Sequence, residues 1–417
     1  MSSPDPTPEY PRLHRAAYSF PAIDNHAHPL LQPIHRSSDA FPFEGLMSEA
    51  QGEALKDAVH TLACFRATSE LGVLYGLKNP TWDEIKSFRA SLDYIELCKR
   101  CIAPTGIQCI LIDDGLGGVQ ENAEAYQWHD QFTPDSTRRL VRVEIIAEEV
   151  LAEVLSLHLD VDHLEVSPIL EEFSNKFTDV LSSFAQDPAV VGFKSIACYR
   201  TGLNIMTYIP LASMKFSLLD VFKMLKDEGK IRLAHKALND HVVRLALEVA
   251  GKYQKPVQFH TGLGDNDISL ANSSPAHMQQ IIKAYPGTTF VLLHSSYPFT
   301  REAGYLTSAY PNVFLDFGEV FPMVSGAGQR AIIRQVLELC PTNKIMWSTD
   351  GHWWPETYYL GTTQARHALY VVLSEVIRDG ELSEEAAIQV VENALFHNAN
   401  TVYKLGLQAK TDILRQD

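Results

Sequence analysis

Short apolar runs alternate with longer amphipathic segments along most of the chain, and this rhythm is the feature that most constrains the fold. Most of the runs are apolar without interruption, which is typical of parallel strands buried on both faces. Strands that alternate with helices form parallel sheets, and eight such units predict an α/β fold, the (β/α)8 or TIM barrel. The eight runs that read as strands are 22–25, 107–113, 140–146, 190–196, 256–260, 289–294, 313–317 and 344–348.

The segments between these runs carry helical patterns. Gly251 is expected to end one of them, and a Gly or Pro follows several others. The chain has 417 residues, and (β/α)8 barrels range from ~200 to more than 400 residues. We therefore expect one barrel at 20–405 rather than two domains, with a flexible extension at 1–19 and a tail at 406–417. The segments with apolar residues at helical spacing are 238–250, 276–283, 331–339, 364–378 and 383–395.

One connection is much longer than the others. About eighty residues, 30–104, separate the first two runs, whereas a strand and a helix are ordinarily joined by about two to six. Thr81 and Glu84 have the spacing of a capping box, and apolar residues recur at three- and four-residue steps from Trp82 to Ile102. We expect a helical insertion after the first strand. The sequence leaves open whether it is a lid over the active-site face or a packing embellishment.

Charge and cysteine content limit the partners and the compartment. The net formal charge is −16, from 35 Lys and Arg against 51 Asp and Glu, and a nucleic-acid interface would need clustered basic residues. No signal peptide or membrane-spanning run is visible. Cys98 and Cys101 form a CxxC pair without a second one, so we expect buried free thiols in a reducing compartment. These features predict a cytoplasmic protein that acts on a small molecule, without nucleic-acid or membrane partners, and leave a homo-oligomer open.

Two histidines stand at the end of the first run, in the string Ile-Asp-Asn-His-Ala-His-Pro. Side chains two apart in a strand point the same way, so His26 and His28 can reach one metal ion. Asp24 and Asn25 are interpreted as residues that orient these histidines, or as strand-end turn residues. An isolated His-x-His pair is weak evidence, because such pairs are more often ordinary surface or hydrogen-bonded histidines.

Four later strand ends repeat this pattern. Lys194 lies in the fourth run, His260 and His294 end the fifth and sixth, and Asp350 follows the eighth. Each is an ionisable or metal-competent residue at the point where an apolar run stops. In a barrel these points share the C-terminal face, where active sites lie. Chance placement of unrelated polar residues is the alternative, and the repetition makes a metal site the stronger hypothesis.

In this order the residues resemble the amidohydrolase superfamily (amidohydrolase-2 type), whose members carry His-x-His after strand one and then Lys, His, His and Asp after strands four, five, six and eight. The likeness spans about 20–405. Three strings are similar to the FluG-type amidohydrolase domain: Asp-Asn-His-Ala-His-Pro, Gly-Phe-Lys-Ser-Ile with Tyr-Arg-Thr-Gly-Leu, and Ser-Thr-Asp-Gly-His-Trp. That domain can be fused to a glutamine-synthetase-like domain in plants and fungi, and we expect this chain to lack the second domain.

Ligand chemistry then suggests roles for these residues. His26, His28 and Asp350 would hold one divalent ion, for which Zn²⁺ is the first candidate, and His260 and His294 would hold a second. The resemblance implies that Lys194 can bridge two ions once it is carboxylated. The alternative is a mononuclear site with an unmodified Lys194 as a base or in an ion pair, and with His294 as the acid/base. In the binuclear form Asp350 transfers the proton of a metal-activated water.

Substrate-binding residues are less strongly indicated. Arg200 could hold a carboxylate or pair with a neighbouring acid, and His352 and Trp353 could wall the pocket. Arg142 and Glu144 are placed on one side of the third strand, in a structural role. Five further histidines are interpreted as solvated bystanders, namely His60, His129, His158, His163 and His277.

The hypothesis is a metal-dependent amidohydrolase that cleaves an amide or related C–N bond in a small carboxylate-bearing substrate. A γ-glutamyl amide is suggested only by the family's association with glutamine-synthetase-like partners. The alternative chemistry is a mononuclear metal-dependent decarboxylase of an unsaturated or aromatic acid. A second alternative is a non-catalytic barrel that senses a ligand, against which the intact set of metal-competent residues argues.

Overall fold

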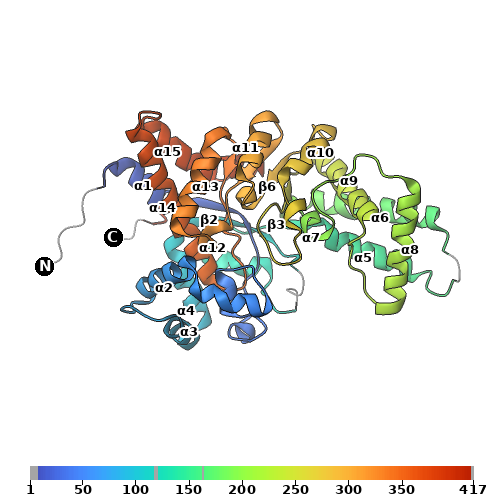
Figure 1. Cartoon of the computed structure of the whole chain (residues 1–417), viewed down its shortest axis with the longest axis horizontal. Helices are drawn as coiled ribbons and strands as arrows, with labels where there is room; N and C mark the ends of the chain where they lie inside the picture. The colour runs from blue at the N-terminus through green and yellow to red at the C-terminus, as the bar shows by residue number, and fades with distance from the viewer. Residues whose placement is uncertain (1–7, 117–120, 162–163, 415–417) are drawn as a thin grey trace. The chain divides into compact units, whose positions relative to one another are not determined.

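The computed structural model describes residues 8–116, 121–161 and 164–414 (Figure 1). Its strands form one eight-stranded sheet in chain order, and every pair with a described register is parallel. The fold is the predicted (β/α)8 barrel. The strands are β1 (Ala22–Ala27), β2 (Ile107–Asp113), β3 (Arg138–Arg142), β4 (Val190–Ser195), β5 (Val257–Phe259), β6 (Phe290–Leu292), β7 (Val313–Asp316) and β8 (Ile345–Met346).

Contacts within the chain group it into two compact units. Unit 1 comprises 1–112, 118–137 and 316–417, and unit 2 comprises 113–117 and 138–315. Unit 1 therefore contains β1, β8 and all but the last residue of β2. Unit 2 contains β3 to β6 and most of β7.

Helices near both ends of the chain pack together in unit 1. The helix α1 (Pro11–Ser19) contacts α14 (Pro355–Arg378) and α15 (Glu384–Glu392), which Figure 1 shows as blue against orange and red ribbons. Ser383 caps α15 by accepting from the Ala386 N–H, and the first-turn acids Glu384 and Glu385 suit the positive end of the helix dipole. A short π-helical turn, Asn393–His397, follows α15.

Residues 30–104 contain the 3₁₀ segment Gly52–His60 and three α-helices, α2 (Leu62–Tyr75), α3 (Trp82–Ser91) and α4 (Tyr94–Ile102). The predicted capping box is present: Thr81 accepts from the Glu84 N–H, and the Glu84 carboxylate accepts from the Thr81 N–H. The apolar repeat after it runs through two helices instead of one. Asp93 caps the second helix by accepting from the Glu96 N–H. A new helix therefore begins in the middle of the apolar repeat.

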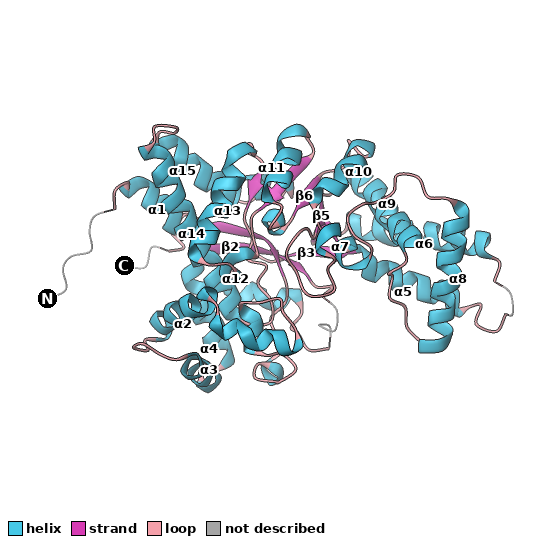
Figure 2. Ribbon diagram, in the orientation of Figure 1, coloured by secondary structure: helices cyan, strands magenta, loops and turns pink. Residues whose placement is uncertain are grey.

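In unit 2 the helices α5 (Val143–Ser156), α6 (Val166–Gln186), α8 (Leu211–Glu228) and α9 (Lys236–Tyr253) lie beside one another (Figure 2). Phe173 and Phe177, one turn apart on α6, are fully buried in this layer. The helix α9 continues through Gly251, where we expected it to end, and stops at Gln254 in the left-handed region. Gly251 allows α9 to approach Thr288 closely, because a Cβ at residue 251 would lie only 2.8 Å from Thr288 Oγ1.

The expected third strand is wrong in its second half. The strand β3 ends at Arg142 and α5 begins at Val143, so Glu144 lies in the first turn of a helix and does not share a strand face with Arg142. The apolar letters continue across this junction, so their pattern gives no signal where the strand stops.

Cys98 and Cys101 on α4 are buried free thiols, as predicted, and the other four cysteines are buried and free as well. In the described part of the chain, no helix has both the length and the apolar character needed to cross a membrane.

His129 is a structural residue and not a solvated bystander. It is fully buried in the 3₁₀ segment Tyr126–Phe132, its Nε2 accepts from the Leu30 N–H at 3.1 Å, and its Nδ1 lies 3.1 Å from the Tyr126 carbonyl. Burial lowers the pKa of His129 to about 4. His60 and His277 are exposed and His158 is half-buried, whereas His163 lies outside the described residues.

We predict that His129 makes the protein acid-sensitive. Its pKa is about 4 in the fold against an ordinary 6.5, so between these values the unfolded chain takes up a proton that the folded chain does not. Stability therefore falls as the pH decreases through this window, by at most about 3 kcal/mol from this residue. Melting temperatures measured from pH 7 to pH 4.5 should fall less steeply in His129→Gln than in the wild type. Equal slopes would contradict the prediction.

Candidate metal centre

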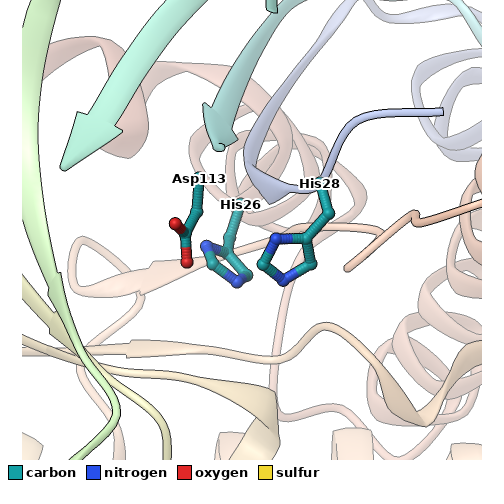
Figure 3. A group of neighbouring side chains, drawn as sticks. All are labelled: His26, His28 and Asp113. Atoms are coloured by element: carbon teal, nitrogen blue, oxygen red, sulfur yellow. The ribbon is translucent and has the colours of Figure 1, made fainter. Parts of the chain in front are cut away.

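The two histidines of β1 and Asp350 converge in unit 1. The His26 and His28 rings project together from the end of β1 (Figure 3), with centroids 4.9 Å apart. Asp350 Oδ1 lies 3.2 Å from His26 Nε2 and 3.4 Å from His28 Nε2. All three residues are at least 90% buried. The structure thus joins three of the predicted metal ligands, although His26 and Asp350 are far apart in the sequence.

The donor set fits a divalent metal ion. Two imidazole nitrogens and one carboxylate oxygen are the ligands that Zn²⁺ takes in catalytic sites. Ligand bonds of about 2.0–2.1 Å in tetrahedral geometry place donor atoms about 3.3 Å apart. The two nitrogen–oxygen distances, 3.2 and 3.4 Å, bracket this edge length. His26, His28 and Asp350 could therefore hold one ion through these atoms.

Backbone hydrogen bonds fix these ligands against one another. The Asp350 N–H donates to the His26 carbonyl at 3.0 Å, and the His28 N–H donates to the Gly351 carbonyl at 2.7 Å. Asp350 has φ of 51°, in the left-handed region that non-glycine residues rarely adopt. Such strain concentrates at functional sites, where the surrounding structure enforces it.

Asp24 ties the same two segments together by its side chain. One carboxylate oxygen accepts from the Thr349 N–H at 2.8 Å, and the other accepts from the Thr349 hydroxyl. Burial raises the pKa of Asp24 to about 8, and the hydrogen bonds from Thr349 oppose this rise. Asn25 donates to Asp316 at 2.8 Å and to the Trp347 carbonyl at 2.6 Å. Both residues bind the segments that carry or flank the candidate ligands.

A second histidine pair forms within unit 2. The rings of His260 and His294 have centroids 4.5 Å apart, and both side chains are buried. His260 Nε2 donates to the Leu263 carbonyl at 2.6 Å, which selects the tautomer with the lone pair on Nδ1. His294 begins three successive residues with positive φ, namely 68°, 54° and 50° through Ser296. These two imidazoles form a second donor set.

Lys194 is buried in β4. Its neighbour Ser195 is held by Glu144, which was expected on the third strand and lies in α5. The Ser195 hydroxyl donates to Glu144 Oε1 at 2.6 Å, and the Ile196 N–H donates to Glu144 Oε2 at 3.0 Å. Burial raises the pKa of Glu144, and the hydrogen bond from Ser195 lowers it. Glu144 therefore clamps the end of the strand that carries Lys194.

Two arginines of unit 2 have acid partners. Arg142 makes a buried ion pair with Asp113, with Nη2 2.6 Å from Oδ2. Asp113, also drawn in Figure 3, is the last residue of β2. It was not among the site residues predicted from the sequence, although an acid at a strand end is the same signal that pointed to Asp350. Arg200 lies 3.4 Å from Glu148 Oε1, and its buried Nε has no hydrogen-bond partner in the described part of the chain.

The two residues expected to wall a pocket lie just after Asp350. His352 is half-buried, and its Nδ1 donates to the Asp350 carbonyl at 2.8 Å. Trp353 has φ of 57° and packs against Phe41, with ring centroids 4.5 Å apart. Trp353 therefore contacts the insertion, while His352 contacts the backbone of a candidate metal ligand.

Comparison with known proteins confirms the predicted resemblance to the amidohydrolase superfamily. Residues 219–405 match the family described as Amidohydrolase. The protein named fluG from Emericella nidulans is 43% identical over 412 residues, which are 95% of this chain and 47% of that protein. The chain thus spans about half the length of that curated relative, and the predicted resemblance to the FluG-type domain is confirmed.

Solved structures support the fold of the chain. A Lactobacillus casei protein described provisionally as a metal-dependent hydrolase matches with a TM-score of 0.77 and 23% identity, covering 94% of this chain and 97% of its own. Uronate isomerases from Thermotoga maritima and Bacillus halodurans match with TM-scores of 0.63 and 0.61 and identities of 12% and 13%. Each match covers 94% of this chain, together with 97% of the Thermotoga isomerase and 95% of the Bacillus isomerase.

We predict that Thr349→Val loosens the metal site. The valine keeps the volume of the threonine but leaves one Asp24 carboxylate oxygen without its hydroxyl donor. Loss of such a supporting contact typically weakens metal binding by about 10–100-fold. Competition of the purified protein with a zinc chelator measures this change. Thr178→Val, which removes a hydroxyl bonded only within α6, is the matched control and should retain metal like the wild type.

Proposed function

We propose that this protein is a metal-dependent amidohydrolase that cleaves an amide or related C–N bond in a small carboxylate-bearing substrate. The observation that carries the proposal is the convergence of His26 Nε2 and His28 Nε2 on Asp350 Oδ1. The resemblance to the amidohydrolase superfamily supports the same chemistry. The solved structures of similar fold include isomerases, so they support the scaffold alone.

A divalent ion held by His26, His28 and Asp350 would polarise a scissile carbonyl and make water more acidic. Asp350 takes the proton of the attacking water and delivers it to the leaving nitrogen, first as general base and then as general acid. The backbone hydrogen bond from Asp350 to His26 holds the carboxylate in place during this transfer. Because His352 Nδ1 donates to the Asp350 carbonyl, its Nε2 keeps a lone pair that can accept a hydrogen bond from the substrate.

The histidine pair of unit 2 supports a second ion. His260 and His294 are proposed as its ligands, so the expected content is two ions per chain. Lys194 is carboxylated in this binuclear form. With a single ion, Lys194 would instead remain an unmodified amine, and the decarboxylase alternative would be favoured.

Arg200 is proposed to bind the substrate carboxylate. Its Nη2 lies at 3.4 Å from Glu148, which is long for a charge-assisted hydrogen bond, and its buried Nε has no acceptor among the described residues. An incoming carboxylate would satisfy this guanidinium. A γ-glutamyl amide is the narrowest form of the proposal, and it rests on the association of FluG-type domains with glutamine-synthetase-like partners.

We predict that Asp350→Asn removes both metal and turnover. The amide is a weaker ligand than the carboxylate and cannot carry the proton, and proton transfer alone is worth about 10²–10⁴ in rate. We expect kcat/KM to fall at least about 10³-fold. Metal content by mass spectrometry and amine release from a panel of γ-glutamyl and N-acyl amides are the measurements.

His60→Ala is the matched control, because His60 is exposed and should leave both readouts unchanged. A wild-type protein without stoichiometric metal would overturn the proposed function. Release of CO₂ from unsaturated or aromatic acids, with one ion and no amine release, would replace hydrolysis with decarboxylation. Full activity of Asp350→Asn would show that the site is misplaced.

A further inference from the structure

A surface pocket of unit 1 gathers basic groups that the proposed reaction does not use. Its volume is about 550 Å³, and it lies between three helices, α2, α13 (Gly326–Leu339) and α14. The first supplies Arg66, the second Gly326 and Arg330, and the third Tyr359 and His367. The pocket therefore contains two guanidinium groups, an imidazole and the first turn of a long helix.

Arg66 is held in place by a closed ring of hydrogen bonds. It donates through Nε to Glu70 at 2.7 Å and through Nη1 to Gln329 at 2.6 Å. Gln329 donates to Gln364 at 2.6 Å, and Gln364 donates back to Glu70 at 2.7 Å. The only acid that lines the pocket, Glu70, is thus engaged on both oxygens. A guanidinium fixed in this way loses little side-chain entropy when it binds a ligand.

Arg330 has no such ties. No hydrogen bond or ion pair engages it in the parts of the chain that the structure describes. Gly326 brings it near Arg66: a Cβ built on Gly326 would lie 2.9 Å from Arg66 Nη1 and 3.6 Å from Arg330 Nη1. Two like charges therefore point to one spot, and only the absence of a side chain at residue 326 keeps that spot open.

The neighbouring groups are consistent with a positive potential. The pKa of His367 is lowered by burial and then by the charges of Arg66 and Arg330. Its Nδ1 lies 2.9 Å from the Tyr18 hydroxyl. The first turn of α13, at Gly326 and Ala327, presents the positive end of a 14-residue helix to the same pocket.

We propose that this pocket binds a phosphate-class oxyanion, between the fixed guanidinium of Arg66 and the untied guanidinium of Arg330. Guanidinium groups match the oxygens of phosphate in paired hydrogen bonds. Glu70 balances the charge of Arg66, so the anion would pair with the charge of Arg330 and accept from the remaining N–H groups of Arg66. The first-turn amides of α13 add to the attraction. The ligand is free phosphate or the phosphoryl group of a small metabolite, which share this chemistry. The site is independent of the proposed hydrolysis.

Calorimetric titration of inorganic phosphate into the full-length, metal-loaded protein tests the proposal. Arg330→Gln should weaken binding by about tenfold or more, since it removes charge-assisted hydrogen bonds. Arg334→Gln, one turn further along α13 and paired with Glu375 outside the pocket, is the matched control and should bind like the wild type. Phosphate that binds at the metal centre would be affected equally in both variants, so the difference between them isolates the pocket.

Gly326→Val provides a second test that keeps both arginines. Its side chain would occupy the spot between the two guanidinium groups, so binding should again fall by about tenfold or more. Acetate should bind much more weakly than phosphate. Glycerol 3-phosphate distinguishes the sources: tighter binding than phosphate indicates a metabolite, and equal binding indicates free phosphate. Undiminished phosphate affinity in both Arg330→Gln and Gly326→Val, no binding at all, or equal binding of acetate would overturn the proposal.

Discussion

The hydrogen-bonded seam between the end of β1 and residues 349–351 is the constraint on which the candidate metal site depends. Two backbone hydrogen bonds and the Asp24–Thr349 contacts join these segments. The seam sets where His26, His28 and Asp350 stand relative to one another, so a donor set of the right size exists before any ion arrives. Such preorganisation reduces the cost of assembling ligands around a metal.

A buried ion pair extends this rigidity into the insertion. Arg89 on α3 donates from Nε to Glu356 Oε1 at 2.5 Å, and Tyr75 donates to the same oxygen at 2.7 Å. Glu356 lies in the first turn of α14, directly after the loop that carries Asp350. Breaking such a pair by removing one partner costs about 3–5 kcal/mol, because the other charge stays buried. The insertion and the metal-site loop are thus anchored to the same helix.

The sequence predicted local structure best where the interacting residues are close together along the chain. The strand β2 was predicted with its observed bounds, because a mostly apolar run ends at an acid, Asp113. The capping box of Thr81 and Glu84 was likewise readable, since both partners lie within one turn. The strand-to-helix junction at Arg142 was not, because the apolar letters continue through it and the helix begins without a side-chain cap.

Contacts between residues far apart in the sequence could not be predicted from the pattern of apolar and polar residues. His129 looked like a loop residue, and only its hydrogen bond from Leu30 shows it to be buried structure. The Asp113–Arg142 pair joins two strand ends whose side chains no periodicity connects. The convergence of the candidate ligands His26, His28 and Asp350 could be predicted because strand ends of a barrel share a face, which is a property of the fold and not of the local sequence.

The seam also has a consequence for synthesis of the protein. Asp24 and Thr349 are 325 residues apart, so the donor set of His26, His28 and Asp350 does not exist until most of the chain has left the ribosome. A bound ion would then act as a cross-link that closes a very long loop, and such closure restricts the unfolded ensemble most strongly. Metal supply would thereby act as a late checkpoint on maturation, with unmetallated chains more exposed to cellular proteases.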